Sequence, residues 1–141
     1  MNAYVNQYKN NHILNASPEQ ILIMLYDGAI RFCRQAMQAM EENRMVDKAQ
    51  NISKAMAIVC EFGNTLDHEV GGKIAEDLDA LYHFMTRELA RANRENDRKA
   101  LETVEDLLSG LRETWAEAAK IYTSEKHSAH NQHGEGISAS L

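Results

Sequence analysis

The chain has 141 residues, of which 44% are hydrophobic and 26% charged, and its formal net charge at pH 7 is -6. This length suits one domain with one core, and the negative charge argues against a nucleic-acid partner, which requires a basic surface. No apolar run approaches the roughly 20 residues of a membrane span, and the N-terminus carries no secretory signal. Cys33 and Cys60 both sit in apolar periodic runs. We therefore expect a cytoplasmic protein with buried, reduced thiols.

Residues 1–16 precede the first predicted helix and are polar and rich in asparagine. They also carry several large apolar side chains, namely Tyr4, Val5, Tyr8, Ile13 and Leu14. Disordered segments seldom hold so many large apolar side chains. We expect this stretch to cap part of the folded domain.

The first predicted helix covers residues 18–42. Ser17 can cap its first turn, Pro18 suits the first helical position, and Gln20 completes a capping box. Asp27 and Gly28 form a dipeptide that is typical of β-hairpins, but the apolar residues on both sides recur at helical spacing. A hairpin would break that spacing, so we predict that both residues are helical. A neighbouring element should pack closely on Gly28, because a mid-helix glycine costs about 1 kcal/mol relative to alanine.

Three further helices follow, over residues 47–67, 73–94 and 98–121. Asp47 and Asp97 are the predicted caps of the second and fourth helices, and Gly71-Gly72 separates the second from the third. His68 and its acidic neighbours are expected at the C-terminal end of the second helix. Short connections make successive helices antiparallel neighbours. The sequence therefore predicts an all-α, up-down-up-down four-helix bundle over residues 17–122, followed by a flexible, disordered tail over 123–141.

The apolar stripes of the four helices also predict which side chains form the core. Ten residues are expected to be the most buried: Leu22, Leu25, Phe32, Met56, Val59, Leu78, Leu81, Leu108, Leu111 and Trp115.

Helical bundles often hold di-metal centres, which require Glu-x-x-His pairs that project inward. This sequence contains no Glu-x-x-His motif, no glycine-rich phosphate loop and no Cys-x-x-Cys. The tail histidines, His127, His130 and His133, are interpreted as solvated residues and not as ligands. We therefore expect no metal, no cofactor and no catalysis.

The first helix is more hydrophobic than a bundle helix needs, because residues 21–26 are apolar on all sides. Cover by the N-terminal segment explains part of this surplus; a groove for a partner helix explains the rest. The two explanations are compatible if the segment is a detachable lid. The predicted partner-binding residues are Tyr4, Tyr8 and Ile13 of the lid and Ile21, Ile23, Met24, Tyr26, Asp27, Ile30 and Met37 of the helix.

Residues 17–32, SPEQILIMLYDGAIRF, resemble the signature of the FliS family, the bacterial flagellin export chaperones. Similar agreement is found in residues 66–75 (LDHEVGGKIA), in Leu81-Tyr82, in residues 89–93 and in the stretch from Leu111 to Trp115. The resemblance covers about Tyr4 to Tyr122, and the tail matches no motif of the family.

This resemblance implies a cytoplasmic four-helix bundle that binds the C-terminal segment of flagellin, prevents its premature polymerisation and delivers it to the flagellar export gate. It also implies that an N-terminal segment with tyrosines covers part of the groove when no client is bound. The alternative is a non-enzymatic bundle that acts as an adaptor or regulator for another amphipathic helix.

Overall fold

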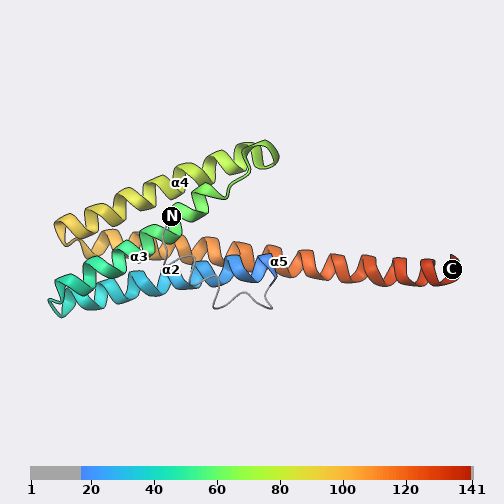
Figure 1. Cartoon of the computed structure of the whole chain (residues 1–141), viewed down its shortest axis with the longest axis horizontal. Helices are drawn as coiled ribbons and strands as arrows, with labels where there is room; N and C mark the ends of the chain where they lie inside the picture. The colour runs from blue at the N-terminus through green and yellow to red at the C-terminus, as the bar shows by residue number, and fades with distance from the viewer. Residues whose placement is uncertain (1–16, 141) are drawn as a thin grey trace.

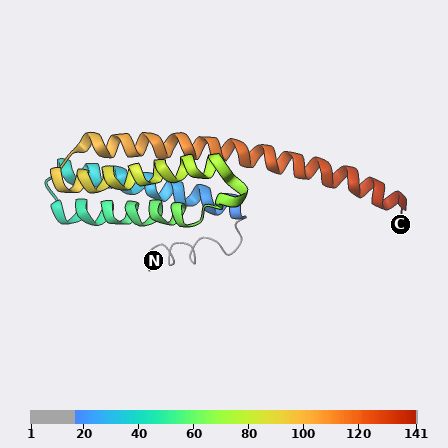
Figure 2. The same cartoon turned by 90° about the horizontal axis from the view of Figure 1, so that it is seen from above.

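The computed structural model describes residues 17–140 of the chain, which form four α-helices and no strand. The helices are α2 (Pro18–Glu41), α3 (Met45–Asn64), α4 (His68–Glu95) and α5 (Arg98–Ser140). Successive helices run in opposite directions, and α5 closes the bundle by packing against both α2 and α4 (Figures 1 and 2). The predicted all-α, up-down-up-down bundle is confirmed.

The start of α2 follows its sequence closely. The Gln20 backbone N–H donates to Ser17 Oγ at 3.2 Å, and the Ser17 backbone N–H donates to Gln20 Oε1 at 2.9 Å. This reciprocal pair is the predicted capping box. The helix then continues through Asp27 and Gly28, with Asp27 exposed to solvent and Gly28 buried. The prediction that this dipeptide is helical is therefore confirmed.

The start of α4 differs from the prediction. The sequence places His68 at the end of the second helix, whereas α3 ends at Asn64 and His68 begins α4. Asp67 caps this new start, because its carboxylate accepts from the backbone N–H groups of Glu69 and Val70. The sequence placed the helix break at Gly71-Gly72. This was wrong because the glycine pair lies inside α4, where Gly72 kinks the helix without ending it.

The end of α5 also differs from the predicted helix end at residue 121, since the helical backbone continues to Ser140. Figures 1 and 2 show that this last part leaves the bundle and runs on as a single helix. A helix can continue on its own backbone hydrogen bonds. The apolar stripe from which the helix end was predicted stops where neighbouring helices no longer pack against it. The bundle boundary near residue 122 and the disorder of residues 123–141 stay predictions.

The core holds only four of the ten side chains expected to be the most buried, namely Leu25, Phe32, Val59 and Leu108. The other six pack against the core but are partly exposed: Leu22, Met56, Leu78, Leu81, Leu111 and Trp115. The position of a residue on the apolar stripe of its helix predicted burial poorly. A side chain on the inner face of a helix is buried only where a neighbouring element covers it.

The two thiols differ as well. Cys33 is buried, and burial raises the pKa of its thiol to about 12. Cys60 is exposed, so the expectation that both thiols are buried is wrong for Cys60.

Candidate functional site

An apolar groove lies at the end of the bundle where α2 and α4 begin. It consists of two adjoining hollows that share Leu22 and Trp115. One hollow extends towards α4 and the end of α3, and the other follows α2 and α5. We define the apolar groove by the residues Pro18, Leu22, Leu66, Val70, Ile74, Leu78, Trp115 and Ala118.

The α4 side of the groove exposes two large apolar side chains to solvent. Val70 is 86% exposed and Ile74 is 69% exposed. Single exposed apolar residues are common on protein surfaces, but a contiguous apolar patch beside a hollow is typical of an interaction site. This wall therefore has the character of a binding surface for an apolar partner.

An aromatic cluster with one ring from each helix supports the floor of the groove. Tyr26 of α2 stacks on Phe62 of α3, with ring centroids 4.3 Å apart. The Tyr26 hydroxyl oxygen lies 2.6 Å from that of Tyr82 on α4, and Trp115 Nε1–H of α5 donates to it at 3.1 Å. This hydrogen bond orients the Trp115 indole, which forms part of the groove wall.

The phenols of the cluster are not suited to acid–base chemistry. Burial raises the pKa of Tyr26 well above its ordinary value, and the hydrogen bond to Tyr82 raises it further. Burial also raises the pKa of Tyr82. Both phenols therefore stay neutral at physiological pH, and their hydrogen bonds satisfy groups that would be costly to bury unpaired.

The structure brings only part of the predicted site to the surface. Ile21, Ile23 and Met24 are half-buried, and Ile23 lines a shallow hollow beside α5. Asp27 is exposed and accepts from Arg112 Nε of α5 at 2.9 Å. Tyr4, Tyr8 and Ile13 lie outside the described residues.

Three predicted site residues lie in the core instead. Tyr26 is fully buried, and Ile30 and Met37 are only 7% and 6% exposed. These side chains face the other helices, so they support the fold in this conformation and offer little surface to a partner. Their role in partner binding stays a prediction.

Sequence reasoning missed most of the α4 side of the groove. Val70 and Ile74 were not among the predicted site residues, although they are apolar residues four positions apart that flank Gly71-Gly72. Apolar residues on both sides of a glycine pair are a usable signal, because a kink at such a pair can turn the first turn of a helix away from its neighbours.

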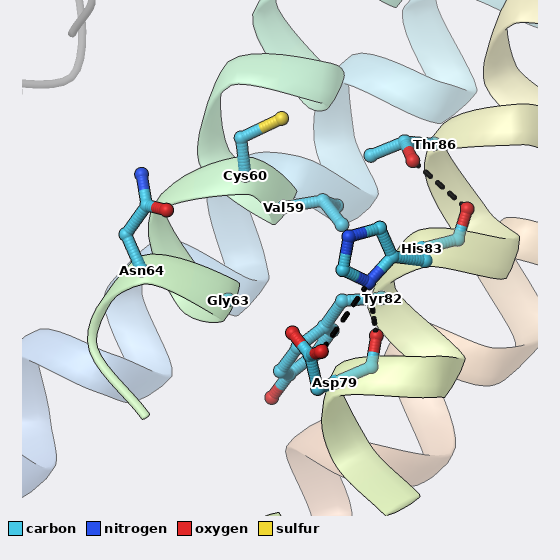
Figure 3. Close-up of a pocket in the computed structure, with 8 residues that line it drawn as sticks. All are labelled: Val59, Cys60, Gly63, Asn64, Asp79, Tyr82, His83 and Thr86. Carbon is cyan, nitrogen blue, oxygen red and sulfur yellow. Dashed lines mark hydrogen bonds and ion pairs between the residues drawn. The ribbon is translucent and has the colours of Figure 1, made fainter. Parts of the chain in front are cut away.

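A second, more polar hollow separates α3 from α4 (Figure 3). Four of the residues that line it belong to α3 and four to α4, among them Cys60, Asp79, His83 and Thr86. His83 Nδ1 lies 2.8 Å from the Asp79 backbone oxygen and 3.5 Å from its carboxylate (Figure 3). Within the described part of the chain, no three His, Cys, Asp or Glu side chains are grouped so that they could hold a metal ion.

Comparison with known proteins places the chain in a family. The sequence model of the family described as flagellar protein FliS matches residues 1–122. The chain belongs to the FliS family. The resemblance seen in the sequence is thus confirmed, and residues 123–141 lie outside the family match.

Individual FliS proteins agree with this assignment. The flagellar secretion chaperone FliS of Salmonella typhimurium is 40% identical over 114 residues, which cover 80% of this chain and 84% of the relative. The proteins of the same name from Bacillus subtilis and Campylobacter jejuni are 32% and 34% identical, and the alignments cover 89% and 91% of those chains. The matches therefore span most of the length of each FliS relative.

No helix in the described part of this FliS-family chain is both long and apolar enough to cross a membrane.

Proposed function

We propose that this chain is a cytoplasmic chaperone for flagellar secretion, which binds the C-terminal amphipathic segment of flagellin and prevents its premature polymerisation. The observation that carries the proposal is the apolar groove, with its exposed wall of Val70 and Ile74, in a chain that belongs to the FliS family. The names of the relatives describe flagellar secretion chaperones, which agrees with a client that must be kept unassembled.

The groove suits an amphipathic helix better than a small molecule. It is open and apolar, and it is lined by the start of α2, the end of α3, the first turns of α4 and the middle of α5. A helix that lays its apolar face into such a groove gains about 25 cal/mol for each Å² of apolar surface that leaves water. A client that wraps over several shallow sites can therefore bind tightly without a deep pocket.

Release is proposed to occur by transfer to a component of the flagellar export gate. The sequence contains no glycine-rich phosphate loop that would support a nucleotide-driven cycle. We accordingly assign the chain no catalytic activity and no cofactor.

Residues 1–16 are proposed to act as a lid over the same groove. They join the described chain at Ser17, and the next residue, Pro18, lines the groove. Their apolar side chains Tyr4, Tyr8 and Ile13 have the chemistry needed to cover it. Because a lid must be displaced by the client, its closing free energy lowers the apparent affinity.

A calorimetric titration with a flagellin C-terminal peptide tests client binding. The unaltered chain should form a stoichiometric complex. Leu22→Ser should weaken it at least about tenfold, because Leu22 belongs to both hollows. Val46→Ser is the matched control, since Val46 is 71% exposed at the other end of the bundle and its removal should leave affinity unchanged. Failure of the unaltered chain to bind the peptide would refute the proposal.

The lid is tested by deleting residues 1–12 in the same titration. A lid predicts a higher affinity or a faster association for the shortened chain. Loss of binding would instead show that the segment clamps the client, and an unchanged affinity would place the segment outside the groove.

A further inference from the structure

The N-cap Asp67 and the first turn of α4, together residues 67–71, are joined by local hydrogen bonds. Asp67 accepts from the backbone N–H groups of Glu69 and Val70 through its carboxylate, each at 3.1 Å. The Gly71 N–H donates to the Asp67 backbone oxygen at 2.8 Å. These three hydrogen bonds all end on Asp67, so they do not depend on the rest of α4.

Gly72 joins this turn to the rest of α4 through a backbone conformation that only glycine adopts readily. Its φ and ψ are 52° and -123°, inside an otherwise helical run. Figure 2 shows the resulting bend at the start of α4. Gly71 has a different role, because a Cβ at this position would lie 2.8 Å from the Cβ of Ala75. One glycine permits the kink and the other permits the close approach across it.

The turn presents Val70 to solvent at the rim of the groove. Val70 is 86% exposed and Ile74, one turn further on, is 69% exposed, yet both line the groove. A side chain so exposed contributes little to folding. These two residues therefore have apolar surface that remains available to a bound partner.

We propose that residues 67–71 form a movable wall of the client site, which turns about Gly72 and covers the apolar face of a bound flagellin segment with Val70. This inference rests on the proposed function, because flagellin is the client whose side chains the wall would cover. The wall moves as a unit, since its internal hydrogen bonds are retained while only the Gly72 backbone changes.

The movement is tested with a matched pair of glycine variants. Neither Gly72 nor Gly110 would bring a new Cβ within 4 Å of another group, but only Gly72 has a positive φ. Gly72→Ala thus changes the backbone preference without a steric clash. It should lower the affinity for the flagellin C-terminal peptide about tenfold, whereas Gly110→Ala in α5 should leave it unchanged.

The contact made by Val70 is tested with a matched pair of valine variants. Val70→Ser should weaken the peptide complex about tenfold, and Val46→Ser, at a site that is also largely exposed, should not. Hydrogen exchange of the unaltered full chain provides a direct readout, since amides in residues 68–74 should exchange more slowly once the peptide is bound.

The outcomes separate this inference from the proposed function. If the unaltered chain binds the peptide but Val70→Ser behaves like Val46→Ser, the wall is overturned and the chaperone function stands. Weaker binding by Val70→Ser with no effect of Gly72→Ala would overturn the movement. Absence of binding by the unaltered chain would overturn both proposals together.

Discussion

The two ends of the bundle are built differently. At the end where α2 meets α3 and α4 meets α5, Leu89, Ala92 and Leu101 are fully buried, and Lys48 Nζ donates to the Asn93 backbone oxygen at 3.0 Å. At the opposite end the apolar groove leaves Val70 and Ile74 in solvent. Figure 1 shows that α4 lies close to α5 at the first end and diverges from it at the second.

This difference suggests that the packed end mainly stabilises the fold and that the grooved end mainly binds a partner. The packed end buries most of its large apolar side chains within the chain, and its exposed apolar residues, Met45 and Val46, line none of the hollows described above. The grooved end retains unburied apolar area, which lowers its contribution to folding but lets it bind an apolar segment. We therefore expect substitutions at the packed end to unfold the bundle and substitutions at the grooved end to change client affinity.

The largest effect on stability is expected from Leu89→Ala at the packed end. Leu89 is fully buried, so the substitution removes buried apolar surface and leaves a cavity, at a cost of about 2–5 kcal/mol in the free energy of unfolding. The matched control is Leu66→Ala at the grooved end, where Leu66 is only partly buried and the cost should be about 1 kcal/mol. Urea unfolding curves measure both. Equal costs would show that the two ends contribute equally to stability.

A smaller effect is expected from Lys48→Met. Lys48 is 5% exposed, and its amine bonds the backbone oxygen of Asn93 and the side chain of Asn96 in the turn between α4 and α5. Methionine keeps the length of the side chain but loses these hydrogen bonds, so the bundle should lose about 1–3 kcal/mol.

The control for Lys48 lies at the grooved end. Lys73→Met removes an exposed ion pair with Asp77, which should cost less than about 1 kcal/mol. If thermal melts show a larger loss of stability for Lys73→Met than for Lys48→Met, the hydrogen bonds of Lys48 do not stabilise the packed end.

Trp115→Phe should have an effect of about 1 kcal/mol on unfolding, because it removes the hydrogen bond to Tyr26 while keeping an apolar ring. Trp115 also lines both hollows, so the same variant should weaken the flagellin peptide complex. Tyr82→Phe is the control. It removes a hydroxyl group from the same cluster, but Tyr82 is only 4% exposed and offers little surface to the peptide. An equal loss of peptide affinity in both variants would mean that the cluster, and not the Trp115 surface, determines binding.

Much of the helical architecture could be predicted from the sequence because its signals are local. The Ser17 capping box and the helical spacing around Asp27 are set by neighbours in the chain. The groove could be predicted only in part. Residues 21–26 are apolar on all sides, so the sequence does not show which of them face a partner. That depends on where α4 begins. The start of α4 is set by the Asp67 cap and by the unusual backbone of Gly72. Tyr26 accordingly belongs to the core, whereas Val70 is at the surface.

The smallest expected effect concerns the pH dependence of the packed end. The hydrogen bond from Arg91 lowers the pKa of Glu88 below its ordinary value of 4.5. A carboxyl group whose pKa is lower in the folded state stabilises the fold above its unfolded pKa, and this contribution is lost as the pH falls towards the folded value. The free energy of unfolding should therefore decrease below roughly pH 4.5, and Glu88→Gln should make that decrease shallower. Arg91→Gln removes these hydrogen bonds and also the ion pair of Arg91 with Asp97, so it should flatten the profile at least as much, as measured by urea unfolding at neutral and acid pH. A profile that both variants leave unchanged would show that this pair does not contribute to the stability of the packed end, and the contrast between the two ends would then depend on other contacts, such as apolar packing and the hydrogen bonds of Lys48.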